Sequence, residues 1–193
     1  MAIYNIAMQR DSRKLRTLNL ISVIFFLLAA VVYLVHEKYS FLRPEQVEDL
    51  SRVVTVHDGD TMSVIMHGQQ AKLRLIGIDA PEIAQVPWGE KAKRHLESLV
   101  SSSGNSLQIE RDFEKNDQYG RILAYAWTAE GRLINLEMIK SGYAVLYTVP
   151  PNVKYAAEFR KAQAEARAKG RGLWGENGLG EMPRDYRKKH PRI

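Results

Sequence analysis

An apolar run stands out near the N-terminus, where residues 18–35 contain no charged side chain. As a helix rising about 1.5 Å per residue, the run would be about 27 Å long, close to the bilayer hydrocarbon thickness of about 30 Å. A buried core helix is the alternative, but the run has no polar face, and a basic segment precedes it. The pattern therefore predicts a transmembrane helix over 18–35.

Beyond residue 51 the pattern changes to short segments, most of them separated by turn-forming residues. Alternation of apolar and polar positions indicates strands, and wider spacing of apolar positions indicates helices. Within one strand, Leu73 and Leu75 share a face while Arg74 points to the other. We predict strands over 52–56, 61–66, 71–78, 107–112 and 122–127, and helices over 89–100, 134–139 and 152–169, the last capped by Asn152.

Five short strands with interleaved helices fit a small closed barrel with helices packed outside it, although the pattern alone leaves other small α+β folds open. The length of 193 residues fits one such domain with appendages. We predict a basic segment over 1–17, a tether over 36–51, a domain over 52–176 and a flexible basic tail over 177–193. The basic run of this tail, Arg187-Lys188-Lys189, is read as solvated, with contact to DNA as the alternative.

The anchor also predicts a topology. No pair of small residues follows the apolar run as a cleavage site would require, so we expect an uncleaved signal anchor, with cleavage and secretion as the alternative. Basic residues before the run favour a cytoplasmic N-terminus, which places the domain on the extracytoplasmic side.

The charge and the cysteine content narrow the possible functions only slightly. The net charge is +6, but the residues before the apolar run carry +3 of it, so the remainder is only mildly basic. The absence of cysteine excludes disulfides and thiolate metal sites.

Three motifs bring carboxylates and two arginines into the domain. Carboxylate oxygens suit a hard cation such as Ca²⁺, and guanidinium groups suit the oxygens of a phosphate. One Asp-Gly-Asp triplet could equally be turn chemistry, because aspartate often bonds its own backbone in turns. Together the motifs indicate phosphodiester hydrolysis; they are Asp58-Gly59-Asp60-Thr61, Arg74 through Asp79-Ala80-Pro81-Glu82, and Asp117-Gln118-Tyr119-Gly120-Arg121.

In this order and spacing, the motifs resemble the staphylococcal-nuclease (thermonuclease) family over residues 52–176, as do the flanking segments 72–78, 88–92 and 172–174. The resemblance implies an α+β fold, a five-stranded OB-fold barrel with three packed helices. It implies one Ca²⁺ held by Asp60, Asp79 and the backbone carbonyl of Ala80, where the family reference has threonine. Glu82 would be the general base or would orient the attacking water.

The remaining roles also follow from the resemblance. Arg74 and Arg121 would bind the scissile phosphate, with Asp58 and Asp117 as supporting residues. Tyr119 and Tyr147 would bind the nucleotide, with packing in the core as the alternative for Tyr147; Val149 stands where the family has a second tyrosine. The spacing of His57, His67 and His95 matches no metal-ligand pattern, so we read them as surface or packing residues.

With the resemblance, we predict a membrane-anchored, Ca²⁺-dependent nuclease that cuts single-stranded or locally opened DNA and RNA. The resemblance further implies that it leaves 3′-phosphate ends. The alternatives are a catalytically inert OB-fold module that binds nucleic acid or protein, and a membrane scaffold. No obligate protein partner is inferred.

Overall fold

The computed structural model describes residues 22–34 and 48–191, and the chain divides into two compact units, Met1–Arg43 and Pro44–Ile193. In the first unit residues 22–34 are helical, with exposed side chains. Among the described residues, no helix combines the length and the apolar character needed to cross a membrane. Residues 18–21 and 35 of the predicted anchor lie outside the described residues, as do the segment 1–17 and residues 36–47 of the tether.

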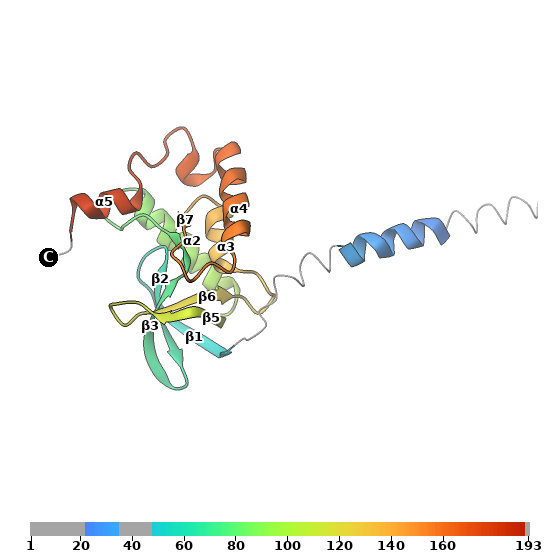
Figure 1. Ribbon diagram of the computed structural model, residues 1–193, viewed down its shortest axis with the longest axis horizontal. Coiled ribbons are helices and arrows are strands. Elements are labelled where there is room, and N and C mark those ends of the chain that lie inside the picture. Colours follow the sequence, from blue (N-terminus) through green and yellow to red (C-terminus); the bar gives the residue numbers. More distant parts are fainter. Residues whose placement is uncertain (1–21, 35–47, 192–193) are drawn as a thin grey trace, which may run out of the picture. The chain divides into compact units, whose positions relative to one another are not determined.

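The second unit is built on a closed barrel of five strands in the order β1-β2-β3-β6-β5 (Figure 1). Neighbouring strands are antiparallel except β3 and β6, which run parallel and close the barrel. This confirms the predicted five-stranded barrel of an α+β domain. The strands are β1 (Glu48–Val56), β2 (Thr61–Met66), β3 (Gln69–Leu75), β5 (Ser106–Asn116) and β6 (Ile122–Trp127).

The first strand begins earlier than predicted, inside the segment assigned to the tether. Ser51 pairs with Leu107 of β5 and is buried, so this part of the chain belongs to the barrel.

The predicted strand 71–78 is broken in two. β3 ends at Leu75, and β4 (Gly77–Asp79) leaves the barrel to pair with β7 (Val145–Tyr147), a strand that the sequence did not predict. Gly77 has a φ of +79°, which favours glycine and allows the change of direction. The break carries Asp79 out of the barrel wall.

A buried asparagine satisfies the backbone at this break. Asn135 is fully buried, and its Nδ2 donates to the Ile76 carbonyl oxygen at 2.9 Å while its Oδ1 accepts from the Ala126 amide at 3.0 Å. Because unpaired buried backbone groups are costly, Asn135 stabilises the exit of β4 from the barrel.

Helices cover one end of the barrel, and the three predicted ones are present with shifted ends. They are α2 (Trp88–Ser102), α3 (Ile134–Lys140) and α4 (Ala156–Ala168), followed by the 3₁₀ turn η1 (Gly172–Trp174) and α5 (Pro183–Lys189). We predicted that Asn152 caps α4, but it does not. Its side chain instead exchanges two hydrogen bonds with the Glu114 backbone, at 2.8 and 2.9 Å, and so holds the end of β5.

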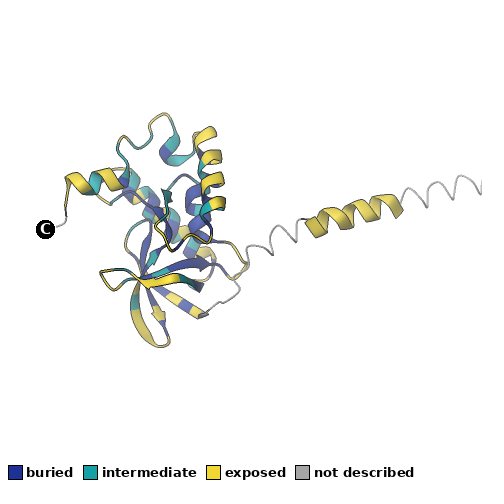
Figure 2. Cartoon of the chain, in the orientation of Figure 1, coloured by how far each residue is buried: buried dark blue, intermediate teal, exposed yellow. Residues whose placement is uncertain are grey.

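The core fills the barrel and the space beneath the helices (Figure 2). Leu73 and Leu75 are buried, as their shared strand face predicts. α2 buries one stripe with a four-residue spacing, Ala92, Leu96 and Val100. This packing fixes α2 beside the acidic turn that precedes it.

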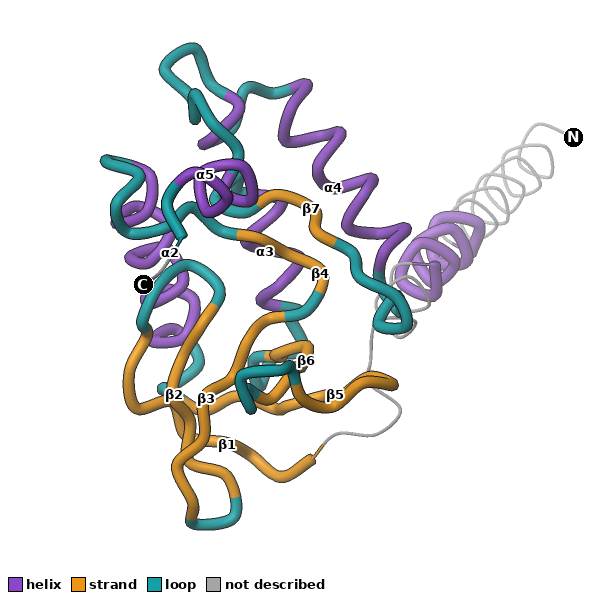
Figure 3. The backbone as a smooth tube through the Cα atoms, turned by 60° about the vertical axis from the view of Figure 1, so that its left-hand side comes forward, coloured by secondary structure: helices purple, strands orange, loops and turns teal. Residues whose placement is uncertain are grey.

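The C-terminal segment differs from the flexible tail that we predicted over 177–193. α5 occupies residues 183–189 and lies beside β4 and β7 (Figure 3). Pro183 opens the helix and is buried, because proline suits the first helical position and here packs against the domain.

Candidate active site

Two acidic segments from different parts of the sequence meet beside the barrel. Asp60 ends the turn between β1 and β2, and Asp79 is the last residue of β4; their exposed fractions are 6% and 1%. The Ala80 amide donates to Asp60 Oδ2 at 2.7 Å and so joins the two segments. Asp58 supports the turn, because its Oδ1 accepts from the Asp60 amide at 3.0 Å.

Small residues permit this approach. A Cβ added to Gly59 would lie 2.6 Å from the Ala80 Cβ and 2.7 Å from the Ala92 Cβ, closer than real Cβ contacts come. Glycine at position 59 therefore lets the turn pack against both the acidic turn and α2. The family reference has threonine at the position of Ala80, and the structure shows a packing reason for the smaller side chain here.

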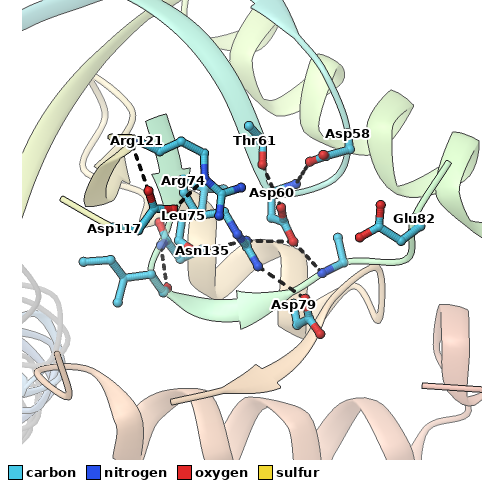
Figure 4. A network of polar contacts seen from close by, with 12 residues as sticks. Asp58, Asp60, Thr61, Arg74, Leu75, Asp79, Glu82, Asp117, Arg121 and Asn135 are labelled. Carbon is cyan, nitrogen blue, oxygen red and sulfur yellow. Dashed lines mark hydrogen bonds and ion pairs between the residues drawn. The ribbon is translucent and has the colours of Figure 1, made fainter. Parts of the chain in front are cut away.

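Arg74 bridges the two buried carboxylates. Its Nη1 lies 2.7 Å from Asp60 Oδ2 and its Nη2 lies 3.3 Å from Asp79 Oδ1 (Figure 4). Burial nevertheless raises the pKa of Asp60 to about 7; Arg74 opposes the shift, and the nearby charge of Asp58 adds to it. A cation next to Asp60 would oppose the effect of burial and favour the ionised form of that carboxylate.

The acidic turn carries Glu82, whose side chain is held by a residue of the basic run that we had read as solvated. Arg187 of α5 places Nη1 3.1 Å from Glu82 Oε1 and Nη2 2.8 Å from Asp79 Oδ2. Burial opposes the charge of Arg187, but its hydrogen bonds to Asp79 and Glu82 outweigh this effect and raise its pKa. The helix signals around Arg187 could have indicated an ordered segment: Pro183 at the start and basic residues in the last turn.

Arg121 is held by the turn between β5 and β6. Its Nε lies 2.6 Å from Asp117 Oδ2, while Asp117 Oδ1 accepts from the Tyr119 and Arg121 amides, both at 2.9 Å. Burial raises the pKa of Asp117, but the hydrogen bonds and charge of Arg121 outweigh burial and leave that pKa below its usual value. Asp117 therefore fixes the direction of the Arg121 guanidinium.

A pocket of about 530 Å³ brings Glu82 and Arg121 together. Most of its wall comes from the barrel and the acidic turn, and α5 supplies the rest. The lining residues are His57, Asp58, Thr61, Lys72, Glu82, Ile83, Ala84, Arg121, Tyr186, Arg187 and His190. The pocket is thus basic and aromatic, next to the buried carboxylates.

The two predicted nucleotide-binding tyrosines do not line this pocket. Tyr119 is exposed on its turn, with the Arg121 guanidinium 5.6 Å from its ring centroid. Tyr147 is half-buried in β7, and the Arg184 guanidinium lies 5.9 Å from its ring. His57 lines the pocket, and its Nε2 is hydrogen-bonded to Ser63 Oγ at 2.8 Å. His67 and His95 do not line the pocket.

The donor set fits a hard cation. The described part of the chain has no group of three or more His, Cys, Asp or Glu side chains placed to hold a metal ion. A cation here would use the carboxylates of Asp60 and Asp79 and the backbone carbonyl of Ala80, with water completing the shell. Oxygen donors of this kind suit Ca²⁺, and a cation at this position would offset the burial that raises the pKa of Asp60.

Fold and site together define a small α+β domain equipped for chemistry on phosphate esters. The chain belongs to the staphylococcal nuclease homologue family, whose model matches residues 72–176, just over half of the chain. This confirms the family resemblance that the motifs carry.

Three relatives illustrate the relationship. The thermonuclease of Staphylococcus intermedius is 36% identical over 131 residues, which cover 63% of this chain and 74% of that protein. The thermonuclease of Staphylococcus hyicus is 34% identical over 136 residues, 66% of this chain and 76% of that protein. The SPbeta prophage-derived endonuclease YokF of Bacillus subtilis is 34% identical over 127 residues, but the match spans only 42% of its length. These names confirm the prediction of an enzyme of the nuclease class.

Proposed function

We propose that the domain is a Ca²⁺-dependent nuclease that hydrolyses phosphodiester bonds of DNA and RNA and leaves 3′-phosphate ends. One observation carries the proposal: Asp60, Asp79 and Glu82 are drawn together by two guanidinium groups, beside a pocket that Arg121 also lines. A hard cation and a phosphate are the ligands that this combination of charges suits.

When bound at Asp60 and Asp79, Ca²⁺ supplies positive charge next to the phosphate. In the structure, Arg74 contacts the carboxylates of Asp60 and Asp79. A cation bound there would neutralise part of their charge, and the N–H donors of Arg74 could then bind a phosphate oxygen. Arg121 already points from a fixed turn into the pocket. Two fixed guanidinium groups would stabilise the charge that develops on the equatorial oxygens.

Glu82 takes the proton of the attacking water. The water oxygen forms a bond to phosphorus, the bond from phosphorus to the 5′ oxygen breaks, and that oxygen leaves as a hydroxyl after gaining a proton from solvent. Glu82 is half-buried and lines the pocket that Arg121 also lines. A carboxylate so placed suits general-base catalysis.

The pocket supports a preference for single strands. A volume of about 530 Å³ is in the range of small-molecule sites and suits one unstacked nucleotide better than a base pair. Strands that are already open would therefore be bound without the cost of unpairing.

We expect the full-length protein, in detergent, to digest single-stranded DNA and RNA in Ca²⁺ and to stop in excess chelator. End analysis should find 3′-phosphates, because water attack expels the 5′ oxygen. An inert binding module predicts the opposite result, retention of a labelled strand without cleavage in Ca²⁺. Digestion that continues unchanged in chelator would contradict the metal requirement.

We also propose that the chain is anchored in a membrane, with the domain on the extracytoplasmic side. The support is the uncharged run 18–35 behind a basic segment, and the exposed apolar side chains of the helix over 22–34. We expect full-length protein in the membrane fraction, and loss of the domain when protease is added from outside.

Matched variants test the anchor. Changing both Leu27 and Leu28 to arginine should release the protein from the membrane fraction, because arginine at the centre of a span is costly. Changing both to isoleucine should not. A soluble wild-type protein that has lost its first residues would instead show cleavage and secretion.

A further inference from the structure

α5 is docked against the active site at several points along its length. Gln85 Nε2 donates to the Glu181 carbonyl oxygen at 2.9 Å just before the helix, and Pro183 is buried. Arg184 lies over the Tyr147 ring, within the distance of a cation–π contact. The family model ends at residue 176, so α5 lies beyond the part of the chain that the family match explains.

Three residues of α5 and its C-terminal end form one wall of the pocket: Tyr186, Arg187 and His190. The rings of Tyr186 and His190 are stacked, with centroids 4.2 Å apart and an angle of 23° between their planes. Both residues line the same pocket as Glu82 and Arg121.

The charge of this pocket favours an anionic strand. Lys72, Arg121 and Arg187 line it, against the carboxylates of Asp58 and Glu82. Arg187 is 35% exposed and pairs through its two terminal nitrogens with Asp79 and Glu82. A cation held by Asp79 would compete with Arg187 for that carboxylate and free Nη2 for a phosphate oxygen, while Nη1 keeps its contact with Glu82.

The rings of Tyr186 and His190 line the active-site pocket, whereas the predicted nucleotide-binding tyrosines do not. Tyr147 is covered by Arg184, and neither it nor Val149 lines the pocket. Base stacking in this pocket therefore has to come from another ring.

We propose that α5 forms a nucleotide subsite of the active site, in which Arg187 binds a phosphate next to the scissile one and the Tyr186–His190 pair stacks on a base. The ligand is a single nucleic-acid strand, and this inference rests on the proposed nuclease function. Stacking reads no particular sequence, so the subsite adds affinity for any unpaired base.

The test is binding of a short, labelled, single-stranded phosphorothioate oligonucleotide, which resists cleavage, to the full-length protein in Ca²⁺. A second probe has the same backbone with abasic sites. Tyr186→Ala should weaken binding of the normal strand about tenfold and leave the abasic strand nearly unchanged, because only the base stack is lost.

Arg187→Gln should weaken binding of both probes about tenfold and lower the slope of log affinity against log salt by about 1. Lys188→Gln is the matched control. It removes the same charge from the neighbouring position of α5, but Lys188 does not line the active-site pocket and pairs with Asp185, so its effect should stay within about twofold. Thermal unfolding of each variant checks that α5 and the barrel remain folded.

Equal effects of Arg187→Gln and Lys188→Gln would overturn the subsite, as would a loss from Tyr186→Ala that is the same on both probes. Tighter binding by Arg187→Gln would also overturn it, because α5 would then obstruct the pocket. Failure of the nuclease proposal would give a different result: the wild-type protein would bind the phosphorothioate strand but would not cut an ordinary phosphodiester strand. If wild type cuts and no α5 variant changes its KM, only the subsite fails.

Discussion

Glu82→Gln is expected to lower kcat by about two to four orders of magnitude, the range over which a positioned general base contributes. Glutamine keeps the size of the side chain and a hydrogen bond to water, but it cannot take the proton. Binding of the strand should change little, because Arg121 and Lys72 still line the pocket. Initial rates on single-stranded DNA in saturating Ca²⁺ measure the effect.

Glu176→Gln provides the control, since it makes the same chemical change at an exposed residue that does not line the pocket. Arg187 retains Asp79 in the Glu82 variant, so the variant should unfold at nearly the wild-type temperature. If kcat fell by less than tenfold with the fold intact, Glu82 would not be the base, and the acidic turn would serve only to place Asp79.

Gly89→Ala is expected to lower the free energy of unfolding by about 1–3 kcal/mol, the usual cost of overpacking, and to reduce activity with it. A Cβ at position 89 would overlap the Glu82 carbonyl oxygen and lie 2.6 Å from the Ile83 Cα. Both are backbone atoms that cannot rotate away, so either α2 or the acidic turn must shift. Urea unfolding and kcat, measured together, report both effects.

Gly180→Ala is the comparison, because a Cβ there meets nothing within 4 Å. Its unfolding free energy should stay within about 0.5 kcal/mol of wild type. Equal stability of the two alanine variants would mean that α2 and the acidic turn can separate without cost, contrary to the close packing described above.

The five barrel strands could be predicted because they leave a strong local signal, whereas their closure into a barrel followed from the family resemblance. Leu73 and Leu75 alternate with polar residues, and the strand ends carry turn residues. The two short strands could not be predicted, since β4 and β7 have three residues each, too few to show a period. Asn152 resembled a helix cap, but a backbone partner 38 positions away decided its role, and no local pattern reports such a contact.

The site also contains residues that the sequence predicted and one that it did not. Asp60, Arg74, Asp79 and Glu82 belong to motifs, and the structure brings them together. Arg187 was missed because three consecutive basic residues near a terminus usually form a solvated segment. Only the packing of Pro183 and the two carboxylates facing α5 distinguish it from such a segment.

The parallel pairing of β3 with β6 has a further consequence for the phosphate site. Arg74 in β3 is paired with Leu123 of β6, and Arg121 is the residue immediately before β6, so the pairing of these two strands fixes where both guanidinium groups begin. The ladder that closes the barrel thus sets the width of the gap between them. A change that slides one strand along the other would alter the grip on the phosphate, even if every charged side chain were kept.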